Sequence, residues 1–169
     1  MKSMILSSLL ALLAGAIYAQ NSAPAPAPAP DATVGADGKM LSHVYNWDKM
    51  IVTPRPNGVR RDVFDAPTAT LTKLHCHIST LNPGERSGAP SLHVQEEVII
   101  VKEGTVEATY DGKSVTSGPG SVIYFAAGAT TALHNPGTTP ATYIVLNYFP
   151  PGAPQPAAAT APAPATTKP

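Results

Sequence analysis

Turn residues interrupt the middle of this chain roughly every ten positions, which leaves no room for a long helix. Asp111-Gly112 is the strongest of these signals, because both residues tolerate the positive φ that a two-residue hairpin turn requires. The other turn signals are Asn82-Pro83-Gly84, Glu103-Gly104, Gly118-Pro119-Gly120 and Asn135-Pro136-Gly137. The pattern therefore restricts the chain to short strands joined by tight turns.

The segments between these turns alternate apolar and polar residues or are rich in β-branched residues, as strands are. The predicted strands are Val59–Phe64, Leu71–Leu81, His93–Lys102, Thr105–Tyr110, Lys113–Ser117, Ser121–Ala126, Thr130–Asn135 and Ala141–Phe149. Short strands at this spacing indicate a sandwich or barrel. We predict an all-β fold, a double-sheet β-barrel of the jelly-roll type. Because aromatic residues make up only 6% of the chain, its core should consist of Val, Ile, Leu and Ala.

Proline marks the ends of the folded part. Most of the 19 prolines lie in two flanking stretches, and both stretches alternate or mix Pro with Ala. Such tracts favour extended polyproline II structure and serve as spacers, because proline has no backbone donor for a regular hydrogen-bond ladder. The predicted organisation is a signal peptide at 1–19, an Ala/Pro-rich linker at 20–37, one folded domain at 38–149 and a disordered Pro/Ala-rich tail at 150–169.

The first residues have the pattern of a secretory signal peptide. Lys2 precedes an apolar run over residues 4–17, and small residues follow, so cleavage is expected after Ala19 or after Ala16. The apolar run is shorter than the roughly 20 residues that span a bilayer. We therefore expect a periplasmic or secreted protein without a membrane span once the signal is removed.

Charge excludes some classes of partner. Eleven basic residues balance eleven acidic ones, which argues against a nucleic-acid binder that works by neutralising phosphates. Arg55, Arg60 and Arg61 form a small basic cluster, which we interpret as a solvated strand face. Cys76 is the only cysteine, so no internal disulfide can form, and we expect it to be a small buried hydrophobic residue.

Two segments resemble the signature motifs of the cupins. Positions Gly84, Ser91, His93, Glu97 and Gly104 align with the first motif. The positions that align with the second motif are Gly120, Ala126, Gly128, Thr131 and Asn135. The stretches HISTLNPGE, EEVIIVKEGTVEATYDGK and NPGTTPATYIVLNY are similar to those of exported single-domain bacterial cupins. The resemblance implies a cupin-type double-stranded β-helix, but this fold carries many unrelated activities.

The resemblance also implies a site that departs from the family pattern. Metal-dependent cupins bind Fe, Mn, Zn, Ni or Cu through three His and one Glu. Here His93 and Glu97 are retained, whereas Ser91 and Thr131 stand where the other two His are expected. Two protein ligands are fewer than a catalytic zinc or non-haem iron site uses. The resemblance therefore indicates a degenerate metal site.

Other histidines could complete such a site. His75 and His77 share one face of the preceding strand, where they are either a surface or interface pair or, for His77, a side chain that faces the barrel. His134 has the opposite parity to Thr131 and should point away from the pocket. His77 is therefore the one candidate for a third ligand beside His93 and Glu97.

We predict that the protein binds a small polar ligand in the barrel. The pocket candidates are Ser91, His93, Gln95, Glu97 and Thr131. In this hypothesis Ser91, Gln95 and Thr131 are hydrogen-bonding wall residues, and a buried Glu beside an imidazole can act as general acid and base.

Two alternatives remain open. The first is a metal-dependent oxygenase or isomerase that uses His93, Glu97 and His77. The second is a non-catalytic structural dimer module. The cofactor is either one divalent metal (Fe, Mn or Zn) or none, and the resemblance implies a homodimer.

Overall fold

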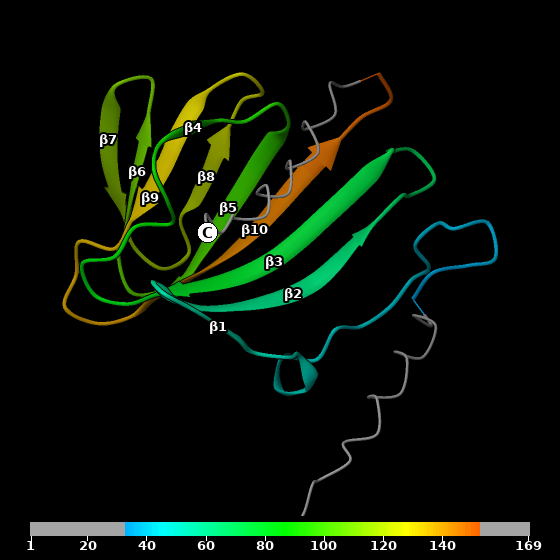
Figure 1. The fold of residues 1–169 in the computed structure, drawn as a ribbon, viewed down its shortest axis with the longest axis horizontal. Coiled ribbons are helices and arrows are strands. Elements are labelled where there is room, and N and C mark those ends of the chain that lie inside the picture. The colour runs from blue at the N-terminus through cyan, green and yellow to red at the C-terminus, as the bar shows by residue number, and fades with distance from the viewer. Residues whose placement is uncertain (1–32, 153–169) are drawn as a thin grey trace, which may run out of the picture. The chain divides into compact units, whose positions relative to one another are not determined.

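Two antiparallel sheets form the domain, as Figure 1 shows for a computed structural model that describes residues 33–152. The larger sheet has six strands in the order β1-β2-β3-β10-β5-β8, and the smaller has four in the order β4-β9-β6-β7. The elements in chain order are η1 (Trp47–Lys49), β1 (Thr53–Arg55), β2 (Gly58–Ala66), β3 (Lys73–Leu81), β4 (Ser91–Leu92), β5 (Glu96–Glu103), β6 (Val106–Tyr110), β7 (Lys113–Ser117), β8 (Val122–Phe125), β9 (Thr130–His134) and β10 (Ala141–Phe149). This arrangement confirms the predicted all-β jelly-roll architecture.

The predicted hairpin at Asp111-Gly112 is confirmed. Tyr110 pairs with Lys113 across it, and both turn residues have positive φ, 47° for Asp111 and 74° for Gly112. These are the dihedral signs of a type I′ turn, whose twist matches that of the flanking strands. The local residues therefore decide where β6 ends and β7 begins.

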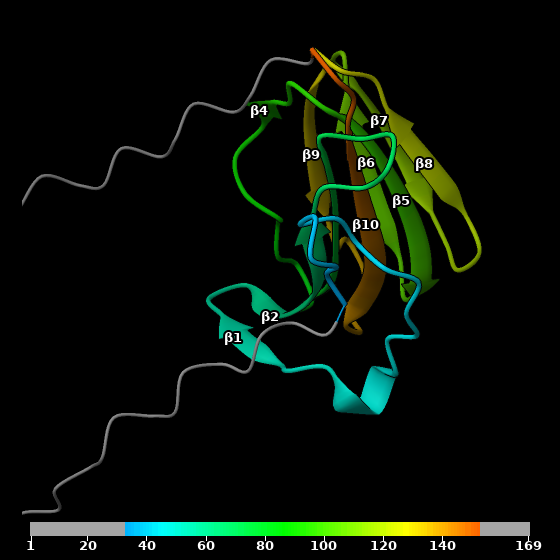
Figure 2. The same cartoon turned by 90° about the vertical axis from the view of Figure 1, so that its right-hand side faces the viewer.

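Three elements are absent from the sequence prediction, and one strand boundary differs from it by more than two residues. The sequence prediction omits η1, β1 and β4, each of which has three residues or fewer. The strand expected from His93 begins at Glu96, because residues 93–95 form a bend after β4. η1 and β1 lie along the outside of β2, away from the smaller sheet (Figures 1 and 2). Short elements of this kind depend on tertiary contacts and carry too little pattern to be predicted.

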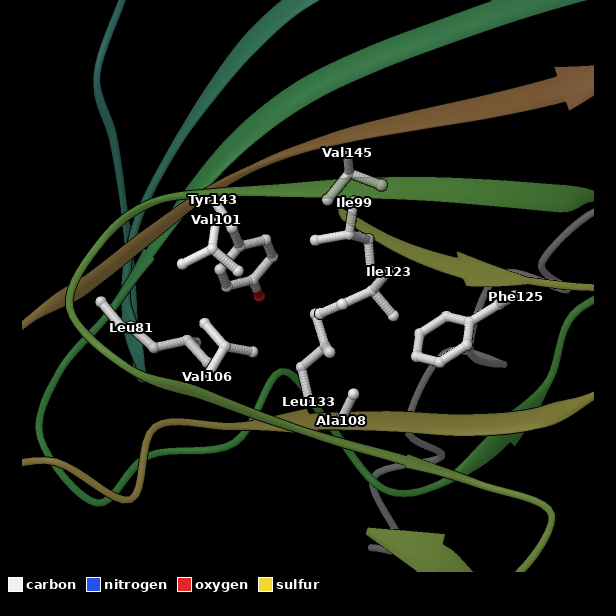
Figure 3. Packing of buried hydrophobic residues seen from close by; sticks show 11 residues of the cluster. Leu81, Ile99, Val101, Val106, Ala108, Ile123, Phe125, Leu133, Tyr143 and Val145 are labelled. Atoms are coloured by element: carbon white, nitrogen blue, oxygen red, sulfur yellow. The ribbon is translucent and has the colours of Figure 1, made fainter. Parts of the chain in front are cut away.

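The core lies between the inner faces of the two sheets (Figure 3). Its members are Leu81, Ile99, Val101, Val106, Ala108, Ile123, Phe125, Leu133, Ala141, Tyr143 and Val145. Alternate residues of β5 point inward, so that Ile99 and Val101 are 0% and 1% exposed. Each such aliphatic side chain contributes about 1.5–3 kcal/mol on burial. The core is mainly aliphatic, as the composition predicts.

Cys76 lies on the opposite face of β3 from the core and is 5% exposed. It pairs across the sheet with Phe64 and Leu146. Burial raises the pKa of its thiol to about 11, so the sulfur remains protonated at neutral pH. The prediction of a small buried hydrophobic residue is confirmed.

Some sequence predictions concern residues outside the described range. The signal peptide at 1–19 lies wholly outside it, as do linker residues 20–32 and tail residues 153–169. Residues 33–37, which the composition places in the linker, belong to a turn in which Val34 bridges to Met40. No helix within residues 33–152 is long and apolar enough to cross a bilayer.

Gly104 should be the least replaceable of the turn glycines that the motifs share. A Cβ there would lie 2.5 Å from Pro140 O, and φ is +74°. We expect Gly104→Ala to lower the free energy of unfolding by about 3 kcal/mol, measured by urea denaturation, because backbone strain and overlap add. Gly120→Ala is the matched control, since φ is +84° but nothing lies within 4 Å. Equal losses for the two variants would contradict the role of the close contact.

Candidate functional site

One row of side chains across the larger sheet is polar where its neighbours are apolar. Strand register places His75 opposite Asn147, Asn147 opposite Glu97, and Glu97 opposite Phe125. The next inward-facing row contains His77, Val145, Ile99 and Ile123. The polar row therefore borders the apolar core, and the core walls off one side of it.

This polar row opens onto a cavity of about 190 Å³ between the two sheets. The cavity is lined by His77, Ser87, Gly88, Ala89, Ser91, His93, Glu97, Phe125, Thr131, Ala132, Leu133, Tyr143 and Val145. Four pocket residues predicted from the sequence thus share one cavity: Ser91, His93, Glu97 and Thr131. Gln95 does not line it but hydrogen-bonds to His93. His134 does not line the cavity and instead lies 3.2 Å from Glu107 Oε1.

Glu97 is held by a partner that the sequence motifs do not name. Asn147 Nδ2 donates a hydrogen bond of 2.6 Å to Glu97 Oε2, and the two residues are only 5% and 8% exposed. A buried carboxylate requires such a donor to offset its lost hydration. The one signal in the sequence is that Asn147 shares its parity with Tyr143 and Val145, so it is a polar residue on a buried strand face.

His93 lies in the bend between β4 and β5, and both of its ring nitrogens have protein partners. Gln95 Nε2 donates to Nδ1 at 3.2 Å, so that nitrogen acts as the acceptor. Nε2 then carries the proton and donates to Ser91 Oγ at 3.1 Å. Nδ1 is 3.9 Å from Glu97 Oε2. The imidazole and the carboxylate therefore adjoin one another, although strand alternation is not what brings them together.

His75 and His77 form a hydrogen-bonded pair on the inner face of β3. Arg60 Nη2 donates to His75 Nε2 at 3.1 Å, so this nitrogen is unprotonated. It also accepts from His77 Nδ1 at 3.0 Å. His77 Nε2 is then left with a lone pair, on a side chain that lines the cavity. Of the two placements open for His77, the structure shows the one that faces the barrel.

Burial dominates the protonation of this pair. Burial, together with the nearby Arg60 guanidinium and His75, lowers the pKa of His77 to about 3, against the opposing effect of Asp62. The pKa of His75 is also lowered by burial, against the opposing effect of Asp65. Burial raises the pKa of Tyr143 to about 12. The cavity wall at neutral pH thus contains an uncharged imidazole and a protonated phenol.

The side chains present do not form the ligand set of a resident metal. His77, His93 and Glu97 line one cavity, but no three His, Cys, Asp or Glu residues within 33–152 are grouped closely enough to hold an ion. His93 uses both nitrogens for Gln95 and Ser91. At the two aligned positions, Ser91 and Thr131 offer neutral hydroxyls, which are poor ligands for a divalent metal. The chemistry of the site therefore rests on hydrogen bonding by its own side chains.

The jelly-roll barrel and the polar cavity between its sheets define a class of protein. Comparison with known proteins identifies the family. Residues 77–147 match the family model described as the cupin domain. The chain therefore contains a cupin domain, which confirms the resemblance found in its motifs. No curated protein sequence matches the chain.

Solved structures agree on the fold. An RmlC-like cupin from Shewanella frigidimarina superposes with a TM-score of 0.54 at 15% identity, covering 66% of this chain and 95% of the other. KdgF from Halomonas sp. gives 0.54 at 14% identity, with coverages of 63% and 94%. A predicted oxalate decarboxylase from Thermotoga maritima gives 0.52 at 15% identity, with coverages of 63% and 99%. At these identities the similarity shows the fold alone.

The lowered pKa of His77 predicts a pH-dependent stability. The unfolded chain protonates this imidazole near its ordinary pKa of 6.5, whereas the folded protein keeps it neutral down to about pH 3. The unfolded state thus binds more protons between these pH values. The stabilisation of the folded state that is linked to His77 is therefore complete above pH 6.5 and is lost as the pH falls toward 3.

Lowering the pH from 7 to 5 should therefore cost the wild type about 2 kcal/mol more unfolding free energy than it costs His77→Gln. Urea denaturation at both pH values measures this difference. His43→Gln, at an exposed position, controls for the loss of an imidazole. Parallel pH dependence in wild type and His77→Gln would contradict the assignment.

Proposed function

We propose that this chain is an exported cupin-domain protein that binds a small polar molecule in the cavity between its two sheets. The cavity measures about 190 Å³, below the roughly 300 Å³ at which pockets for drug-sized ligands begin. Its walls combine buried apolar side chains such as Val145 and Phe125 with a few polar groups. Apolar walls with a few placed polar groups are typical of sites that orient one small ligand.

The observation that carries this proposal is a set of cavity-lining polar atoms without a protein partner. Within residues 33–152, no residue hydrogen-bonds to Thr131 Oγ1, Glu97 Oε1 or His77 Nε2. Thr131 and Glu97 are 3% and 8% exposed. Buried polar groups are nearly always hydrogen-bonded, so these atoms are available to a ligand or to water.

The chemistry of these atoms favours a ligand rich in hydroxyl groups. Glu97 Oε1 and His77 Nε2 can accept hydrogen bonds, whereas the hydroxyls of Thr131 and Tyr143 can each donate one. A hydroxyl both donates and accepts, so a molecule with several hydroxyls satisfies all four residues. Thr131 thereby acquires a role in place of the missing metal ligand.

Export and self-association are part of the same proposal. The signal-type sequence at residues 1–19 supports export. The cupin resemblance supports a homodimer. Within the described structure, β8 is an edge strand with Val122 and Tyr124 66% and 58% exposed, which is consistent with pairing through this side.

Binding of a polyol should depend on Thr131. We expect glucitol to bind the purified protein, and Thr131→Val to weaken it about five-fold, because one hydrogen bond contributes about 1 kcal/mol. Protein-detected NMR titration measures both affinities. Thr130→Val is the matched control, since Thr130 is exposed on the same strand and does not line the cavity. Identical affinities in wild type and Thr131→Val, or no binding of any hydroxylated probe, would refute the proposal.

The same preparation tests the metal-dependent alternative, for which His77, His93 and Glu97 are the candidate ligands that line one cavity. Elemental analysis after growth with added Fe, Mn and Zn measures the bound metal. Stoichiometric metal that is lost in His93→Ala would support an oxygenase or isomerase type of site. Metal below one-tenth of an equivalent in every medium would rule that alternative out.

A further inference from the structure

We propose that a second cavity, beside the barrel cavity, holds the anionic group of the ligand, so that the protein recognises a small hydroxylated anion, a carboxylate or a phosphate ester. The inference rests on the proposed function, because it assigns the other end of the same ligand. The second cavity measures about 270 Å³. It is lined by Arg55, Asn57, Val59, Arg60, His77, Ser79, Thr80, Leu81, Ser87 and Tyr143.

The two cavities adjoin each other. His77, Ser87 and Tyr143 line both of them, one from each of β3, the loop after β3, and β10. These three side chains form a shared wall rather than two separate surfaces. A ligand that contacts Tyr143 or His77 from the barrel is therefore within reach of the groups around the second cavity.

Charge distinguishes the second cavity from the first. Its only charged side chains are Arg55 and Arg60, and no Asp or Glu lines it. Arg55 is exposed and forms no ion pair within residues 33–152. Arg60 Nε donates a hydrogen bond to Asp62 Oδ1 at 2.6 Å, and Arg60 Nη2 donates one to His75 Nε2 at 3.1 Å. Three of its five N–H donors remain for a ligand, and a guanidinium matches the geometry of carboxylate and phosphate oxygens.

The arginines that the sequence groups together are separated by the sheet. Arg60 lies on the inner side of β2, where it reaches His75. Arg61 points to the outer side, where its guanidinium stacks on the Trp47 ring at 4.3 Å. The three arginines therefore do not form one solvated face, because strand alternation sends neighbouring side chains to opposite sides. Only Arg55 and Arg60 serve the cavity.

The β1–β2 hairpin that carries these arginines is fixed in place. Asn57 Nδ2 donates to Arg86 O at 2.6 Å, and Asn82 N donates to Asn57 O at 3.0 Å. Gly58 packs so closely on β3 that a Cβ would lie 1.9 Å from Thr80 O. A rigid hairpin presents its cations without an ordering cost on binding. The hairpin precedes the segment 77–147 that matches the cupin model.

The two cavities together orient a ligand. The carboxylate of Glu97 repels an anionic group, which disfavours placing that group in the barrel. In the second cavity, the guanidinium groups of Arg55 and Arg60 attract the same anionic group. Hydroxyls then face Glu97 and Thr131, while the anion faces Arg55 and Arg60. The ligand class follows from this polarity.

Three probes of similar size test the assignment. Gluconate carries a carboxylate, glucose 6-phosphate carries a phosphate, and glucitol carries neither. We expect at least one anion to bind the purified wild type about tenfold more tightly than glucitol, as measured by NMR titration at constant ionic strength. Arg55→Gln should remove most of this preference, so that the anions bind about as tightly as glucitol does. Arg60→Gln should also reduce the preference, although it also disturbs Asp62 and His75.

Arg86→Gln is the matched control, because Arg86 is exposed close to the hairpin but lines neither cavity. Arg55→Lys keeps the positive charge but loses the guanidinium group, which can donate two parallel hydrogen bonds. This variant should retain part of the preference for anions. Which anion binds more tightly assigns the group as carboxylate or phosphate. No anion preference in wild type, or an equal loss in Arg55→Gln and Arg86→Gln, would overturn the inference. If Thr131→Val still weakens glucitol in that case, the proposed function survives without it.

Discussion

The pairing of β10 with both β3 and β5 is the constraint on which the rest of the structure depends. It sets Asn147 beside Glu97 and His75, and Val145 beside His77 and Ile99. Because side chains alternate along a strand, a slip of one residue would turn the site outward and leave the core without its members. The apolar residues on the same faces prevent that slip. Core packing and site geometry are therefore set by the same register.

The apolar core also determines how the polar groups behave. It closes one side of the cavity and contributes to the burial of His77, so the imidazole remains neutral and acts as an acceptor. Glu97 is buried beside Asn147, whose amide offsets part of the cost of burying a carboxylate. Uncharged donors and acceptors next to one carboxylate suit recognition of hydroxyl groups. The proposed recognition of hydroxyl groups therefore requires no metal ligand at Ser91 or Thr131.

A hairpin beside the barrel cavity supplies the positive charge that the cavity itself lacks. Two arginines, Arg55 and Arg60, line the second cavity from a hairpin that two hydrogen bonds of Asn57 hold in place. The cupin segment itself supplies a carboxylate, so the pair of cavities is acidic at one end and basic at the other. Folds of this class host many activities, so the activity of a member has to be argued from the residues of its site.

The sequence by itself determined the all-β architecture, most strand boundaries and the hairpin at Asp111, because turns and alternation are local patterns. It also indicated four residues that line the cavity. Only the tertiary structure decided that Asn147 binds Glu97, that His77 faces the barrel, and that Arg60 rather than Arg61 reaches His75. These outcomes join strands far apart in the chain. They depend on register and on a bulge in β2 near Asp62, which no local pattern records.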